Sequence, residues 1–138
     1  MTEVNRVPLY FYGLFMDADL LREKGAYPIN IRRGSVPGWA VRIGQRATLV
    51  RQDGARSHGV LMDLTHDEID RLYAEQSLTA YRPEPVLAET EDGSVVAALS
   101  FNLPVPPAPQ ERNATYVEKL RSLAQRLSLP ADYIASIE

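Results

Sequence analysis

The sequence contains no cysteine among its 138 residues, which excludes disulfide bonds, thiolate metal sites and cysteine nucleophiles. It also lacks any apolar run long enough to cross a membrane as a helix. The N-terminal stretch MTEVNRVPLYFYG lacks the basic start, apolar centre and small-residue cleavage site of a signal peptide. We therefore expect a cytoplasmic protein that has no membrane partner.

Basic residues form no stripe along the chain. There are 15 Lys and Arg against 18 Asp and Glu, which gives a formal net charge of -3. Basic residues that are adjacent in sequence form only short pairs, such as Arg32-Arg33. A nucleic-acid-binding protein normally gathers its Lys and Arg on one face or along one helix. We expect no nucleic-acid partner.

Histidine is also scarce, with His58 and His66 as the two examples. Together with Asp63, Asp67 and Glu68 they leave a metal-dependent hydrolase open as an alternative, but their spacing does not match H-E-x-x-H. The acids after His66 are better explained as part of the first turn of a helix, where the helix dipole favours negatively charged side chains. The chain also lacks G-x-S-x-G and G-x-G-x-x-G, so we expect no nucleophile elbow and no dinucleotide site.

The composition that is present is that of one globular domain over residues 1–138, with 45% hydrophobic and 24% charged residues. Apolar and β-branched runs predict strands at 7–12, 58–64, 81–90 and 94–103, several short bent strands between 29 and 50, and turns at Asp53-Gly54 and 91–93. Helical spacing predicts helices at 18–24, at 66–76 after a Thr65 capping box, from about Asn113, and after Pro130. This order predicts an α+β fold, a small curved mixed β-barrel with flanking helices.

The stretch Tyr12-Gly13-Leu14-Phe15 ends the first predicted strand and is the first candidate for a binding site. Glycine at a strand end allows the backbone to approach a ligand closely, and successive amides in such a turn can hold a carboxylate. The same residues also fit a plain turn between a strand and a helix. The residues alone leave both interpretations open.

Glu75, near the end of the predicted helix 66–76, is the candidate catalytic residue. A carboxyl group beside an apolar face can have its pKa raised toward neutrality and act as a general acid or base. From the residues alone, an exposed surface glutamate is the simpler interpretation. The tyrosines, among them Tyr81 and Tyr116, are expected mainly in the core, where any hydroxyl could also reach a pocket.

Three motifs together resemble the γ-glutamylcyclotransferase-like (AIG2-like) proteins. That family opens with a strand ending in Tyr-Gly-Ser/Thr-Asn/Leu, continues with a Gly-x-Leu/Val-x-Asp-Leu strand, a helix, a glutamate and a Tyr-x-x-x-x-Val strand, and often closes with Leu-Pro-x-x-Tyr-x-x-x-Leu/Ile. The matching segments are Tyr12–Phe15, Gly59–Leu64, Glu75, Tyr81–Val86, Tyr116 and Leu129–Ile137. The resemblance spans almost the whole chain.

This resemblance implies a cyclisation reaction. The free α-amine of a γ-glutamyl amine, amino acid or peptide attacks its own γ-carbonyl, forming 5-oxoproline and releasing the attached amine. Glu75 would act as the general acid and base, and Tyr12, Gly13, Leu14, Phe15, Tyr81 and Tyr116 would bind the substrate. The reaction needs neither a metal nor a cofactor, and the resemblance leaves open a monomer or a homodimer.

The chain departs from the family pattern at several positions. Leu14 stands where a hydroxyl residue is expected, Phe15 follows it, Gln76 replaces a common glycine, and Phe101 replaces a common tyrosine. These changes suggest a different γ-glutamyl substrate or reduced activity. The alternative is a catalytically weak or inactive protein that binds a small metabolite on the same fold.

Overall fold

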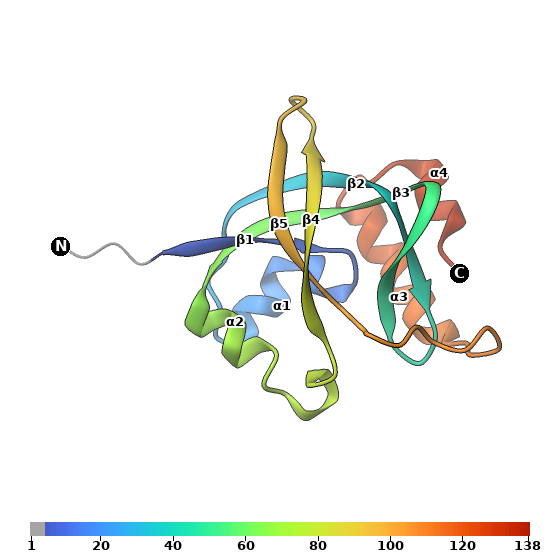
Figure 1. Cartoon of the computed structure of the whole chain (residues 1–138), viewed down its shortest axis with the longest axis horizontal. Coiled ribbons are helices and arrows are strands. Elements are labelled where there is room, and N and C mark those ends of the chain that lie inside the picture. The colour runs from blue at the N-terminus through green and yellow to red at the C-terminus, as the bar shows by residue number, and fades with distance from the viewer. Residues whose placement is uncertain (1–4) are drawn as a thin grey trace.

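The computed structural model describes residues 5–138, so Met1–Val4 of the N-terminal stretch lie outside the described residues. The strands are β1 (Arg6–Phe11), β2 (Ile29–Ile43), β3 (Ala47–Thr65), β4 (Arg82–Thr90) and β5 (Val95–Asn102). The helices are α1 (Ala18–Glu23), α2 (His66–Leu72), α3 (Ala114–Arg126) and α4 (Ala131–Ser136), with short 3-10 turns η1 (Leu14–Met16) and η2 (Gln76–Leu78). Figure 1 shows the strands crossing at the centre, with α1 and α2 below β1 and the pair α3 and α4 on the right.

The strands close into a barrel in the order β1-β3-β2-β4-β5. All neighbours are antiparallel except β1 and β5, which pair in parallel through Leu9 and Leu99 and close the barrel. Pro83 and Pro85 lie where β4 pairs with β5 alone, because β4 meets β2 only near Glu89 and Thr90. This agrees with the edge position expected for prolines that cannot donate a hydrogen bond. The predicted mixed barrel with flanking helices is confirmed.

The region predicted as several short strands is instead a pair of long strands, β2 and β3. The prediction of a turn at Asp53-Gly54 is wrong, because both residues lie within β3. Pairing shifts from Trp39↔Arg51 to Pro37↔Arg56, so β3 accommodates extra residues as an irregularity. Gly54, with φ of 81°, adopts there a backbone conformation that glycine allows, so the glycine bends a strand without ending it.

One continuous hydrophobic core fills the barrel and extends under the helices. Consecutive buried residues of β1 (residues 9–11) and β3 (residues 60–62) contribute to it, and α3 covers it through Leu120, Leu123 and Ala124. Gly59 allows this packing at one point, because an added Cβ would overlap the carbonyl oxygen of Phe11 on the paired strand. The buried residues of α3 belong to the apolar stripe that helical periodicity predicts for this segment.

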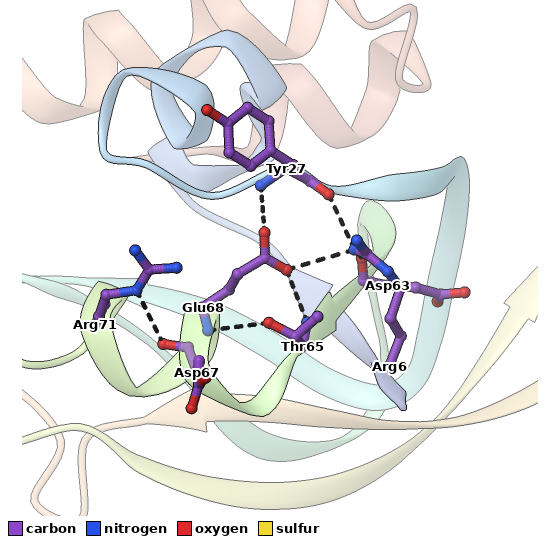
Figure 2. Close-up of polar contacts among 7 residues, drawn as sticks. All are labelled: Arg6, Tyr27, Asp63, Thr65, Asp67, Glu68 and Arg71. Atoms are coloured by element: carbon purple, nitrogen blue, oxygen red, sulfur yellow. Dashed lines mark hydrogen bonds and ion pairs between the residues drawn. The ribbon is translucent and has the colours of Figure 1, made fainter. Parts of the chain in front are cut away.

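Glu68 fastens α2 to the start of β2 and to β1, as Figure 2 shows. Its side chain is 5% exposed. One carboxylate oxygen accepts from the Tyr27 amide at 2.5 Å, and the other accepts from the Thr65 amide at 2.8 Å and lies 3.4 Å from the Arg6 guanidinium. The Thr65 hydroxyl in turn accepts from the Glu68 amide at 3.2 Å, so the predicted capping box is present.

Helix α2 ends at Leu72, earlier than the predicted boundary near residue 76. The Tyr73 ring stacks on Phe101 with centroids 3.9 Å apart, and the Leu78 amide donates to the Glu75 carbonyl to start a separate turn. Glu75 therefore lies in a turn between α2 and η2, and not in the last turn of a helix. Packing of Tyr73 against the barrel explains why a favourable helical sequence stops there. Over residues 5–138, no helix combines the length and the apolarity that crossing a membrane requires.

Candidate active site

A cavity of about 320 Å³ opens at the end of the barrel where β1 finishes. Its wall combines the end of β1 and the loop after it, the residues around the start of β3, the turn after α2, and single residues from α1, β5 and α3. It is lined by Tyr10, Phe11, Tyr12, Gly13, Leu14, Phe15, Leu20, Gln45, Arg46, Ala47, Tyr73, Ser77, Leu78, Tyr81, Phe101 and Tyr116. All six residues predicted to bind the substrate are in this lining, brought together from positions 12 to 116.

Gly13 is required because Tyr116 approaches it closely from α3. The Leu14 amide donates to the Tyr116 hydroxyl oxygen at 3.3 Å, and a Cβ on residue 13 would overlap that oxygen. The φ of Gly13 is -111°, so close approach, and not a left-handed backbone, explains the glycine. The Leu14 amide, which was expected to hold a ligand carboxylate, is thus already bonded to Tyr116 in this structure.

We expect Gly13→Ala to destabilise the protein by about 1–3 kcal/mol, the usual cost of forcing a methyl group into a packed site. The next atom of Tyr116, Cζ, would lie 3.8 Å from the new Cβ, which is an ordinary contact. The same substitution in a Tyr116→Phe background should therefore cost much less. Urea unfolding of the two single variants and the double variant measures this coupling, and equal costs of Gly13→Ala in both backgrounds would contradict the interpretation.

The hydroxyls of Tyr12 and Tyr81 are engaged by the backbone. Tyr12 donates to the Phe101 carbonyl at 2.7 Å, and Tyr81 donates to the Ala47 carbonyl at 2.5 Å. Burial raises the pKa of both hydroxyls, so both are neutral near pH 7. These two tyrosines therefore offer a ligand mainly their ring surfaces.

Tyr73 and Tyr116 are the tyrosines whose hydroxyls can still serve a ligand. The Tyr116 oxygen accepts from Leu14 and keeps its own proton to donate, and burial raises its pKa to about 12. The Tyr73 hydroxyl makes no hydrogen bond within residues 5–138, and burial raises its pKa also. Around them Phe15 packs edge-on against Tyr73 at 6.0 Å, so the polar groups are set in an aromatic wall.

Arg46 is the charged residue of the lining. Its guanidinium donates to the Ser77 carbonyl at 3.4 Å, and its Cζ lies 6.0 Å from the centre of the Tyr81 ring. Sequence reasoning missed Arg46, because it follows Gly44 between two strands with no motif around it. It placed Tyr73 with the other tyrosines, mainly in the core, and did not single it out for the site.

The carboxylate of Glu75 lies outside this lining and pairs with the ammonium of Lys24, which follows α1. The Lys24 side chain is 29% exposed and that of Glu75 is 42% exposed. Tyr73 and Ser77, two residues to either side of Glu75, both line the cavity, as does Leu20 one helical turn before Lys24. The pair thus sits beside the cavity wall with the carboxylate facing an ammonium group. The predicted catalytic role of Glu75 stays a prediction.

No model of a known protein family matches the sequence, and no curated protein matches it. Solved structures do match the fold. A gamma-glutamyl cyclotransferase superposes with a TM-score of 0.76 at 17% identity, over 97% of this chain and 89% of the other. This chain has the γ-glutamyl cyclotransferase-like fold.

Two further solved structures are similar to this chain over most of its length. An uncharacterised protein from Homo sapiens gives a TM-score of 0.74 at 18% identity, covering 96% of this chain and 88% of that one. An AIG2-like protein from Mus musculus gives 0.59 at 11% identity, covering 79% and 89%. At sequence identities this low, the structural similarity establishes the fold alone, and an activity must be argued from the site.

The two histidines lie apart from the cavity of this γ-glutamyl cyclotransferase-like barrel. The His58 ring packs 5.0 Å from the Tyr133 ring, and burial followed by the nearby Arg56 charge lowers its pKa. His66 is exposed at the start of α2. Within residues 5–138 no group of three or more His, Asp or Glu side chains is placed to hold a metal ion.

Proposed function

We propose that this chain is a γ-glutamyl cyclotransferase-type enzyme that converts a γ-glutamyl compound to 5-oxoproline and a free amine. The observation that carries the proposal is the position of Glu75. Its carboxylate lies beside an aromatic cavity and is already paired with an ammonium group, that of Lys24. The substrate of a cyclotransferase presents an ammonium group of its own. Glu75 is therefore a receptor for the group that must lose a proton.

The reaction begins with exchange of one ammonium for another. The substrate's α-ammonium replaces that of Lys24 at the Glu75 carboxylate, and the ion pair between two partly exposed side chains costs only about 0.2–1 kcal/mol to open. A substrate bound in the cavity then places its ammonium where Glu75 can accept a proton. The proximity of the amine and the γ-carbonyl in one folded molecule supplies much of the acceleration.

The chemical step conserves all atoms of the substrate. Glu75 takes a proton from the α-ammonium, the free amine attacks the γ-carbonyl carbon, and a new C–N bond closes a five-membered ring. As the original amide C–N bond breaks, Glu75 passes this proton to the leaving nitrogen, and the second proton, which the ring nitrogen loses, is carried to the leaving nitrogen in the same way, so the amine departs as an ammonium ion. The products are 5-oxoproline and the amine, and the carboxylate is regenerated.

Negative charge develops on the γ-carbonyl oxygen while the ring closes. The Tyr116 hydroxyl is suited to donate to that oxygen, because the Leu14 amide already occupies its lone pair and leaves its proton free. Its pKa of about 12 keeps it protonated at neutral pH. A buried donor fixed before the reaction stabilises such charge without reorganisation.

The proposal is tested by measuring 5-oxoproline release from γ-glutamyl amines, γ-glutamyl amino acids and glutathione. Release from at least one of these substrates, saturating with substrate concentration, is the expected result. Absence of 5-oxoproline with every substrate would reject the proposal.

Lys24→Met should lower KM up to about fivefold, because the substrate's ammonium no longer competes with Lys24 for Glu75. The value of kcat should change little, since Lys24 does not line the cavity. Lys119→Met, which removes an exposed ammonium from α3, is the matched control. An increase of KM in Lys24→Met would mean that Lys24 holds Glu75 in its working position, contrary to the exchange described above.

A second candidate is a protein that binds a small metabolite without turnover. It is favoured by one observation: within residues 5–138, the cavity lining contains no carboxylate, and Leu14 and Phe15 add apolar surface. Saturable binding of a γ-glutamyl compound without release of 5-oxoproline would support this candidate. Glu75 would then be a surface residue paired with Lys24.

A further inference from the structure

We propose that Arg46, the lone cation of the cavity lining within residues 5–138, anchors the carboxylate of the ligand and limits the ligand to one carboxylate joined to an apolar amine portion. This inference deepens the proposed function and rests on it for the γ-glutamyl part of the ligand. Among γ-glutamyl compounds it selects the amides of apolar amines over γ-glutamyl amino acids and peptides.

Arg46 has most of its hydrogen-bonding capacity free. Its one bond within residues 5–138 is the donation to the Ser77 carbonyl at 3.4 Å, and no acid there pairs with it within 4 Å. The acid that senses its charge is Glu111, whose carboxylate already accepts from the amides of Ala108 at 2.7 Å and Gln45 at 3.2 Å. A guanidinium has five N–H donors in a planar fork that matches a carboxylate.

The rest of the lining is apolar or neutral. The side chains of Leu14, Phe15, Leu20, Leu78 and Phe101 contribute hydrocarbon surface. The tyrosines add ring surface, and burial raises the pKa values of their hydroxyls, so they carry no charge at neutral pH. The nearby ammonium of Lys24 is paired with Glu75 and lies outside the lining.

Charge matching follows from these groups. A γ-glutamyl amide of an apolar amine carries one carboxylate for Arg46 and one ammonium for Glu75, and its amine portion can rest against Phe15 and Phe101. A γ-glutamyl amino acid carries a second carboxylate on the leaving portion, which would enter this apolar region without a partner. Burying an unpaired carboxylate is costly, whereas burying a hydrocarbon group is favourable.

The sharpest probes are γ-glutamyl-phenethylamide and γ-glutamyl-phenylalanine, which share the same ring and differ by one carboxylate. Calorimetry with the wild-type protein should give a dissociation constant at least tenfold lower for the phenethylamide. Arg46→Gln should weaken phenethylamide binding about tenfold or more, the usual effect of losing a hydrogen bond to a charged group. Arg42→Gln, a surface arginine of β2 outside this lining, is the matched control.

A gain-of-function variant separates charge from simple loss of fit. Leu78→Arg adds a second cation to the lining, and it should improve binding of γ-glutamyl-phenylalanine relative to the phenethylamide. A variant that improves one ligand over the other cannot be explained by misfolding. Circular dichroism of each variant confirms that the barrel is intact.

The outcomes distinguish this inference from the proposed function. Preference for the phenethylamide in the wild type, together with weaker phenethylamide binding in Arg46→Gln, supports the inference even where no 5-oxoproline is released, a result that would reject turnover alone. Equal or tighter binding of γ-glutamyl-phenylalanine would overturn the inference even where both compounds are cyclised. Unchanged affinities in Arg46→Gln, or no binding of either probe, would overturn it as well.

Discussion

Glu75→Gln should reduce 5-oxoproline release about 100- to 10,000-fold, the range expected when a general acid-base group is removed. Glutamine preserves the size of the side chain but cannot accept a proton from the substrate's ammonium. The loss should appear in kcat as well as in kcat/KM, because the proton is transferred during the chemical step. Initial rates of 5-oxoproline formation with the best substrate of the panel measure this effect.

The Glu75 pair with Lys24 is partly exposed, so its removal should change the free energy of unfolding by less than about 1 kcal/mol. A large loss of activity with unchanged stability therefore separates a catalytic role from a structural one. Glu23→Gln, an exposed carboxylate at the end of α1, is the matched control and should retain full activity. Full activity of Glu75→Gln would show that Glu75 is not the proton carrier.

Glu68→Gln should lower the free energy of unfolding by about 2–3 kcal/mol at pH 7, the second large effect we expect. Both carboxylate oxygens of Glu68 accept hydrogen bonds, one from Tyr27 and one from Thr65 (Figure 2). Glutamine has one acceptor oxygen, so its NH₂ group must face a backbone N–H donor. Urea unfolding at pH 7 measures the loss.

The pH dependence of Glu68 provides an independent check. Burial by itself raises the pKa of this carboxyl, but the hydrogen bonds from Thr65 and Tyr27 and the Arg6 charge outweigh it, so the net pKa is lowered. A carboxyl with a lowered pKa in the folded state stabilises the protein above its unfolded pKa, about 4.3. That contribution is lost as the pH falls from there through the folded value.

The difference in stability between wild type and Glu68→Gln should therefore be constant near neutrality and shrink in the acid range. Asp67→Asn is the control, since Asp67 occupies the same helical turn but is exposed. It should cost no more than about 1 kcal/mol, the usual contribution of a helix-dipole interaction at the surface. A constant difference for Glu68→Gln down to the most acid pH would contradict the assignment of its lowered pKa.

Much of the fold could be predicted because its signals are local. The capping box at Thr65 and Glu68, the hairpin around Gly93, and the apolar stripe of α3 each depend on residues within a few positions of one another. The length of β2 and β3 could not be predicted in this way. Gly54 breaks a strand pattern in the sequence, but β3 pairs with β2 on both sides of this glycine, so the strand continues past it with an irregularity.

The residues of the candidate site that belong to a sequence motif could be predicted. The contacts between residues distant in sequence could not. The glycine at position 13 predicted that another group approaches the backbone closely, but only the fold shows that this group is the Tyr116 hydroxyl. The pairing of Glu75 with Lys24 joins positions 51 residues apart, and the turn that holds Glu75 depends on the Tyr73 ring stacking on Phe101. Periodicity carries no information on such contacts.

The parallel contact between β1 and β5 has a consequence for the order in which the molecule can assemble. Leu9 pairs with Leu99, so the first strand waits for most of the chain before its second edge is covered. Tyr116 reaches Leu14 from still later in the chain. Contacts between such distant segments form late and slow the search for the native state. A ribosome would therefore release most of the polypeptide before the walls of the cavity can come together.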